Sequence, residues 1–244
     1  MRGFSLVELS IVLVILGLLT GGILSGQSLI RAAEIRKVTT TLQTYQGTMY
    51  TFRDKYFALP GDMKTATKFW GAANTAGTGG ECADRANNAG TGTETCNGNG
   101  NGDIPLNDAD ALVNERFRFW QHLANAGLIE GNYTGLGSSE VTGTNIPRLL
   151  NGGITAQTLG NFVGAATVFP SNYGTALRMV DVGLTATEAW NIDTKIDDGK
   201  ATTGRFIAGY RNAVTCVTSP DPLLAEYAVQ DNGLCRGTIL KTGL

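Results

Sequence analysis

The chain has 244 residues and a formal charge of −2, from 19 basic and 21 acidic residues. A charge this close to zero provides no long-range attraction to nucleic acid or anionic lipid, so the sequence gives no support for a polyanion-binding function. The hydrophobic share of 42% is ordinary for a chain that folds, and the length allows one large domain or two small ones.

An apolar run near the N-terminus is the first strong feature. No charged residue occurs from Leu9 to Ile30, and these 22 residues reach the roughly 20 that a helix needs to cross a bilayer. Glu8 lies at the start of the run. A carboxylate without a partner costs on the order of 2.5 kcal/mol at the centre of a membrane and less near its edge. Its presence predicts a cationic partner. A cleaved secretory signal is the alternative interpretation of the run.

The helical pattern continues beyond the point where a secretory signal would stop. Apolar residues at alternating steps of three and four define one helix face: Ile35, Val38, Leu42, Tyr45, Met49, Phe52 and Tyr56. We therefore predict one helix from Phe4 to about Lys55, about 75 Å long at 1.5 Å per residue. Its residues 4–30 form an apolar half and its residues 31–56 an amphipathic half. Pro60 ends it, because proline disfavours helix in its predecessor.

Gly3 followed by FSLVELSIVLVILGLL resembles the class III signal of type IV prepilins and of the related pseudopilins of type II secretion. The resemblance covers residues 1 to about 30 and rests on a Gly, then Phe, then Glu four residues later at the head of an apolar run. It implies a leader of residues 1–3, cut by a prepilin peptidase between Gly3 and Phe4, and N-methylation of Phe4. The new amine would then pair with Glu8 of a neighbouring subunit, because opposite charges attract strongly among apolar helices.

The same resemblance implies where the protein acts and with what. It would lie in the bacterial inner membrane before assembly, contact the inner-membrane assembly machinery, and then join identical subunits in a helical filament. That filament would be an extracellular, adhesive type IV pilus or a periplasmic pseudopilus of the secretion system.

After the long helix, residues 71–107 are rich in Gly, Asn and Thr and predict a long loop, which requires a staple or a ligand. The four cysteines fall in two local pairs without the CxxC spacing of zinc or redox sites. In an exported chain, Cys82 with Cys96 and Cys216 with Cys235 is the simplest of three connectivities, and four free thiols is the alternative. A C-terminal disulfide also occurs in many type IV pilins, as the resemblance implies.

The same loop has the spacing of an EF-hand-type calcium loop. Oxygen-bearing side chains alternate, Gly102 stands at the sixth place and Ile104 at the eighth. The predicted ligands are Asn97, Asn99, Asn101, Asp103 and Asp108. Asparagine replaces aspartate at the first three places, so the affinity would suit only calcium near millimolar. The alternative is a cluster of Asn-Gly turns that binds nothing.

The remaining residues predict an α+β head over 57–244. One helix is predicted from Asp108 to Ala126 with Gly127 as its cap, and another from Thr185, which has capping-box spacing to Glu188. Short β-rich runs predict an antiparallel sheet: GAATVFP, ALRMVDV, GRFIAGY, AEYAVQ and CRGTIL. The predicted fold class is thus α+β, a long N-terminal helix whose amphipathic half packs on a C-terminal head.

Three functions follow as hypotheses. The first is a structural subunit of a type IV pilus-like filament, and the second is a type II secretion pseudopilin or minor pilin. The third, from another class, is a membrane-anchored periplasmic enzyme. The sequence has no nucleophile motif, metal triad or phosphate-binding Gly loop. Its only histidine, His122, has no Ser, Cys or second His near it in sequence and is assigned a structural role.

Overall fold

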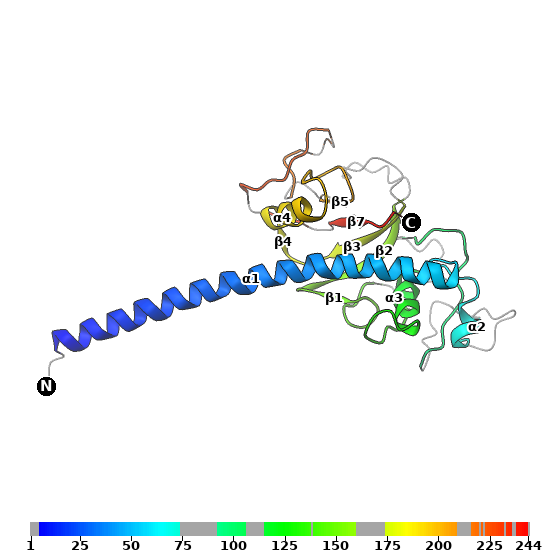
Figure 1. The fold of residues 1–244 in the computed structure, drawn as a ribbon, viewed down its shortest axis with the longest axis horizontal. Coiled ribbons are helices and arrows are strands. Elements are labelled where there is room, and N and C mark those ends of the chain that lie inside the picture. Colours follow the sequence, from blue (N-terminus) through cyan, green and yellow to red (C-terminus); the bar gives the residue numbers. More distant parts are fainter. Residues whose placement is uncertain are drawn as a thin grey trace. The chain divides into compact units, whose positions relative to one another are not determined.

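The computed structural model describes residues 5–73, 92–105, 115–137, 139–159, 174–208, 216–219, 221, 223–231, 233–235 and 238–243. The chain divides into two compact units, Met1–Thr40 and Thr41–Leu244. Helix α1 (Leu6–Tyr56) contributes residues to both (Figure 1). Its 51 residues confirm the prediction of a single long helix.

The first unit consists of the earlier part of α1. Its large apolar side chains from Leu6 to Ile30 are exposed. By length and composition this helix could cross a membrane. Its hydroxyl groups donate to carbonyls of the same helix, as Ser10 does to Val7 at 2.8 Å and Thr20 to Leu16 at 2.9 Å. The hydroxyls of Ser10, Thr20, Ser25 and Ser28 therefore have partners without water.

An antiparallel sheet organises the second unit. Its five strands follow the order β1-β2-β3-β7-β5, with bounds β1 Arg148–Leu149, β2 Gly152–Leu159, β3 Gly174–Val180, β5 Phe206–Ile207 and β7 Ile239–Lys241. A second, two-stranded sheet pairs β4 (Leu184–Thr185) with β6 (Leu234–Cys235). All these pairs are antiparallel. Together with α1 they confirm the predicted α+β fold class.

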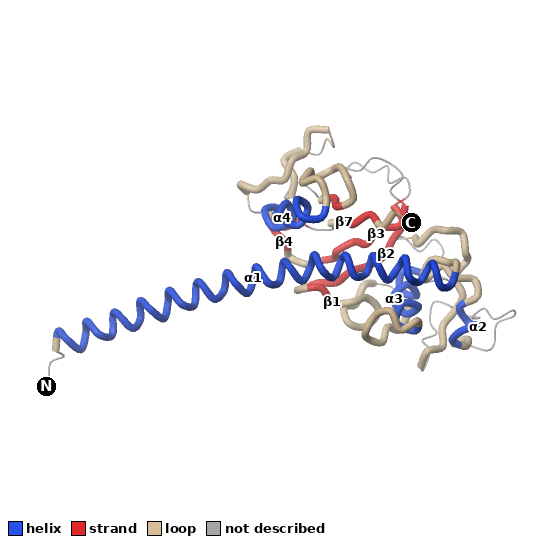
Figure 2. Tube along the Cα trace, in the orientation of Figure 1, coloured by secondary structure: helices blue, strands red, loops and turns tan. Residues whose placement is uncertain are grey.

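Two details of the sheet differ from the prediction. The eight-residue strand β2 was not predicted, although Ile154 and Ala156 alternate with Thr155 and Gln157 in the period of a strand. The run AEYAVQ was predicted as a strand and forms only an isolated bridge, from Tyr227 to Val217. Short strands are separated by long loop segments (Figure 2). The run GAATVFP lies outside the described residues.

The described residues of the second unit also form three shorter helices: α2 (Ala66–Trp70), α3 (Glu115–Asn125) and α4 (Ala186–Ile196). The predicted helix Asp108–Ala126 is present where it is described, and Gly127 ends it with φ of 70°. Leu128 N–H then donates to Leu123 O at 3.0 Å, as in a Schellman cap. The predicted capping box of α4 is confirmed, with both Thr185 and Glu188 making their reciprocal bonds.

Aromatic rings fill the core where the last turns of α1 meet α3. Tyr45 meets Trp120 edge to face at 5.1 Å between ring centroids, and Phe52 stacks on His122 at 6.4 Å. Phe52, Trp120 and His122 are fully buried. Aromatic pairs in these arrangements contribute about 0.5–1.5 kcal/mol each beyond their buried area. This part of α1 is therefore held by packing rather than by helix propensity.

Candidate functional site

The start of α1 is the first candidate site. Glu8 lies in the first turn, and its Oε2 accepts the backbone N–H of Ser5 at 2.9 Å. The hydroxyl of Ser5 in turn accepts the N–H of Val7 at 3.3 Å. Ser5 thus begins the helix with half of a capping box. Sequence analysis missed this role of Ser5, although the S-x-x-E spacing of Ser5 and Glu8 is its signature.

Gly3 and Phe4, the predicted cleavage and methylation residues, lie outside the described residues. The structure places Glu8 in the first turn of α1, where its carboxylate accepts the N–H of Ser5, the residue that follows Phe4. A carboxylate at a helix N-terminus also faces the positive end of the helix dipole. Glu8 is therefore held at the same end of the helix where cleavage would create an amine.

The predicted calcium loop forms the second candidate site, and a carboxylate from elsewhere fills its centre. Asp62, in the turn after α1, accepts backbone N–H groups of Gly100, Asn101 and Gly102 at 2.5, 3.1 and 2.8 Å. Glu115, at the start of α3, accepts the N–H of Asn99 at 2.8 Å. Burial raises the pKa of Asp62, and its bonds to Gly102, Gly100, Asn101 and Glu115 oppose that rise.

The side chains of this loop have distinct partners. Asn99 and Asn101 each accept the N–H two residues ahead, at 2.9 and 2.8 Å. Asn97 instead accepts the N–H of Thr67 in α2, at 2.9 Å, and Asp103 is exposed. Asp108 lies outside the described residues. The structure thus brings Asn99, Asn101 and Asp103 to the turn around Asp62, and calcium binding there stays a prediction.

Close packing explains a glycine in this loop. Gly98 approaches Asp62 so closely that an added Cβ would lie 2.4 Å from its backbone. Sequence analysis missed Asp62 and Glu115 as partners of the loop. The bonds from Asp62 span 38 to 40 residues, so no local spacing could reveal them.

His122 lies at the centre of a buried network beside this loop. The N–H of Gly61 donates to His122 Nδ1 at 3.0 Å, which leaves Nε2 to carry the proton and donate to Thr95 Oγ1 at 3.0 Å. Thr95 donates to Gln121 Oε1 at 2.7 Å. Burial, and then the nearby charge of Arg118, lower the pKa of His122 to about 3. With both nitrogens bonded inside the core, the imidazole has no open side for a substrate.

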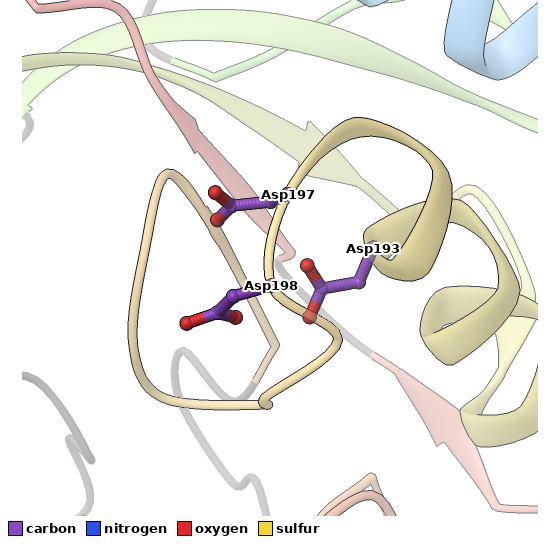
Figure 3. Close-up of side chains that lie close together, drawn as sticks. All are labelled: Asp193, Asp197 and Asp198. Atoms are coloured by element: carbon purple, nitrogen blue, oxygen red, sulfur yellow. The ribbon is translucent and has the colours of Figure 1, made fainter.

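Three aspartates gather at the C-terminal end of α4. The ligand atoms of Asp193, Asp197 and Asp198 all lie within 4.8 Å of one another, and Figure 3 shows their carboxylates around a common space. Burial raises the pKa of Asp193 to about 7; Tyr227 and the Gly199 N–H oppose the rise, and Asp198 and Asp197 add to it. Sequence analysis missed this cluster, although D-x-x-x-D-D is helical spacing that brings carboxylates together.

Disulfides fix the second unit at two places. Cys216 and Cys235 form a disulfide, the predicted C-terminal pair. Cys96 is buried and disulfide-bonded as well, and its predicted partner Cys82 lies outside the described residues. None of the cysteines in the described part of the chain is free. Cys235 belongs to β6, so the described bond joins the small sheet to the turn at Cys216.

Comparison with known proteins identifies the N-terminal signal. Residues 1–24 match the family model of the prokaryotic N-terminal methylation motif. This match confirms the predicted class III prepilin signal of type IV pilins and pseudopilins. No curated protein and no solved structure matches the chain.

Proposed function

We propose that this protein is a structural subunit of a type IV pilus-like filament, assembled through the apolar part of α1 after removal of residues 1–3. One observation carries the proposal: a helix that bears the prepilin signal presents its apolar side chains outward from Leu6 to Ile30. So large an exposed apolar surface requires a membrane or other subunits to cover it. A structural rather than a catalytic role is part of the proposal.

Glu8 sets the register in this mechanism. Before assembly the apolar segment lies in the inner membrane, and the peptidase exposes the amine of Phe4 for methylation. In the filament, the amine of one subunit pairs with Glu8 of its neighbour. A carboxylate among apolar helices is strongly destabilised without a cation, so subunits that fail to align are disfavoured.

Glycines on the same helix support close packing of subunits. Gly17 and Gly21, and likewise Gly22 and Gly26, are spaced four residues apart, and nothing lies within 4 Å of a Cβ added at any of them. Small residues at this spacing allow helices to approach closely in an apolar medium. Filament assembly would cover these open positions.

The Glu8→Val variant tests the proposal, with Ser10→Val as its matched control. Ser10 is also exposed on the apolar segment, and its hydroxyl bonds only to its own helix. We expect Ser10→Val to form filaments visible by electron microscopy and Glu8→Val to form none, with both chains processed. Mass spectrometry of the mature N-terminus should find methylated Phe4. Normal filaments from Glu8→Val, or a mature chain that keeps Met1, would overturn the proposal.

The copy number of this chain in the filament distinguishes a major pilus subunit from a pseudopilin or minor pilin. A major subunit should form abundant filaments when it is the only pilin present, whereas a minor pilin should appear in few copies beside another subunit. Quantitative mass spectrometry of sheared filaments measures that ratio. A low ratio would move the assignment to a minor pilin without changing the role of Glu8.

A further inference from the structure

Hydrogen bonds from the loop after α4 hold the aspartate cluster of the second unit in place. Asp193 is on α4, Asp197 caps that helix, and Asp198 follows. Asp197 Oδ2 accepts the N–H of Arg205 and, at 2.9 Å, that of Phe206. Asp198 accepts the N–H of Lys200 at 2.9 Å and the hydroxyl of Thr203 at 2.5 Å. The loop after α4 therefore fixes two carboxylates beside the third.

Asp193 has a carboxylate atom without a partner. Its side chain is fully buried, Oδ2 accepts the hydroxyl of Tyr227 at 2.8 Å, and the N–H of Gly199 also faces the carboxyl group. Its Oδ1 is buried and makes no hydrogen bond. Figure 3 shows this carboxylate directed toward the space between Asp197 and Asp198. A buried polar atom left unpaired destabilises the fold, and more so when it is charged.

No basic side chain of the described residues neutralises the cluster. The salt bridges there join Arg31 to Glu34, and both Arg116 and Arg178 to Glu140. Lys195, Lys200 and Arg205 belong to the same helix and loop, and none of them forms a salt bridge with a cluster carboxylate. Hydrogen bonds from N–H and O–H groups reduce the repulsion among the three carboxyl groups but bring no positive charge to them.

We propose that Asp193, Asp197 and Asp198 bind one divalent cation, calcium by the chemistry of the ligands. The three side chains supply only oxygen, which suits calcium and magnesium rather than zinc or copper. Oxygens within 4.8 Å of one another fit around an ion with the 2.3–2.6 Å bonds of calcium. Asp198 is exposed, so an ion can enter from solvent and retain water molecules as further ligands.

The proposed ion would link three parts of the second unit. It would join α4 to the loop that leads into β5, through Asp197 and its bonds to Arg205 and Phe206. Through Asp193 it would also act on Tyr227, which lies in the segment closed by the Cys216–Cys235 disulfide. This site is separate from the Asn97–Asp103 loop, and it does not depend on filament assembly.

Calcium and terbium titrations of the purified full-length chain in detergent test the proposal. After removal of calcium with a chelator, we expect calorimetry to find saturable binding and thermal unfolding to shift to higher temperature with added calcium. Terbium should give sensitised emission, because Tyr227 donates directly to a ligand carboxylate. Magnesium should produce a smaller thermal shift. No binding and no thermal shift up to millimolar calcium would overturn the proposal.

Four substitutions locate the ion. Asp193→Asn and Asp198→Asn should each reduce affinity at least tenfold and lose the terbium signal. Asp181→Asn, an exposed aspartate outside the cluster, and Asp103→Asn, in the other loop, should bind as the wild type does. Asp193→Asn also removes a buried acidic group that lies beside two other aspartates, so in chelator it should unfold at the same or a higher temperature than the wild type. Calcium binding that survives Asp193→Asn, or that is lost with Asp103→Asn alone, would overturn the assignment.

Discussion

Two stretches of α1 place apolar side chains in opposite surroundings. In the apolar segment Leu13 is 62% exposed, whereas Leu42, near the start of the second unit, is fully buried. Both belong to one continuous helix, and both are leucines on an apolar face. Helix formation therefore does not decide what each stretch does. What covers the apolar side chains decides it.

The difference separates stability from assembly. Burying a leucine stabilises the second unit by about 1.5–3 kcal/mol relative to leaving it exposed. The exposed leucines of the apolar segment contribute no such energy within one chain. Their energy becomes available only when lipid or another subunit covers them, as the proposed filament requires.

Replacing one leucine in each stretch is the most direct test of this difference. Leu42→Ala should reduce the free energy of unfolding of the second unit by about 2–5 kcal/mol, through lost burial and a cavity. Leu13→Ala should leave that free energy unchanged. Guanidinium unfolding in detergent, followed by tryptophan fluorescence, measures both. Equal losses from the two variants would show that the stretches do not differ in this way.

The C-terminal disulfide should give the next largest effect, again confined to the second unit. Cys216 and Cys235 are separated by 19 residues, a loop length for which a disulfide contributes about 3 kcal/mol. The double variant Cys216→Ser/Cys235→Ser avoids a free thiol and should unfold at lower denaturant by that amount. The far-ultraviolet circular dichroism of α1 should persist. A loss below about 1 kcal/mol would mean that packing alone orders this segment.

The contrast between the two stretches also explains which features the sequence could predict. Glu8 and the apolar run are local, so spacing predicts the helix, and resemblance to a short motif predicts the signal. The capping box of Thr185 and Glu188 is local in the same way. The partner of the Asn99–Asp103 turn is Asp62, and the partner of Asp193 is Tyr227, 34 residues away. Such pairs depend on tertiary packing. The sequence of one segment therefore does not predict which residue of the other segment it will contact.

The core of the second unit should also resist protonation. Because the pKa of His122 is lowered to about 3, the folded chain keeps it neutral while the unfolded chain binds a proton below about pH 6.5. Its contribution to stability is complete above pH 6.5 and falls by about 1.4 kcal/mol per pH unit below that. Arg118 is the charged group that opposes protonation.

Proton NMR measures this pKa directly, since His122 is the only histidine. Its ring resonance in the folded full-length chain should stay constant from pH 8 to pH 5. In denaturant the same resonance should titrate near pH 6.5. A folded-state midpoint near 6.5 would contradict the buried, singly protonated network with Gly61 and Thr95.

Glycine replacements should give the smallest effects on the free energy of unfolding. Gly127 ends α3 with φ of 70°, and nothing lies within 4 Å of an added Cβ, so Gly127→Ala should cost only the left-handed conformation. That amounts to about 1–2 kcal/mol in the unfolding of the second unit.

Gly17→Ala has equally open space inside the helix. It should stabilise the helix by about 1 kcal/mol and leave the second unit unchanged. If Gly17→Ala nevertheless reduces filament yield, an added methyl group obstructs a neighbouring helix, and the apolar segment is packed closely in the assembly.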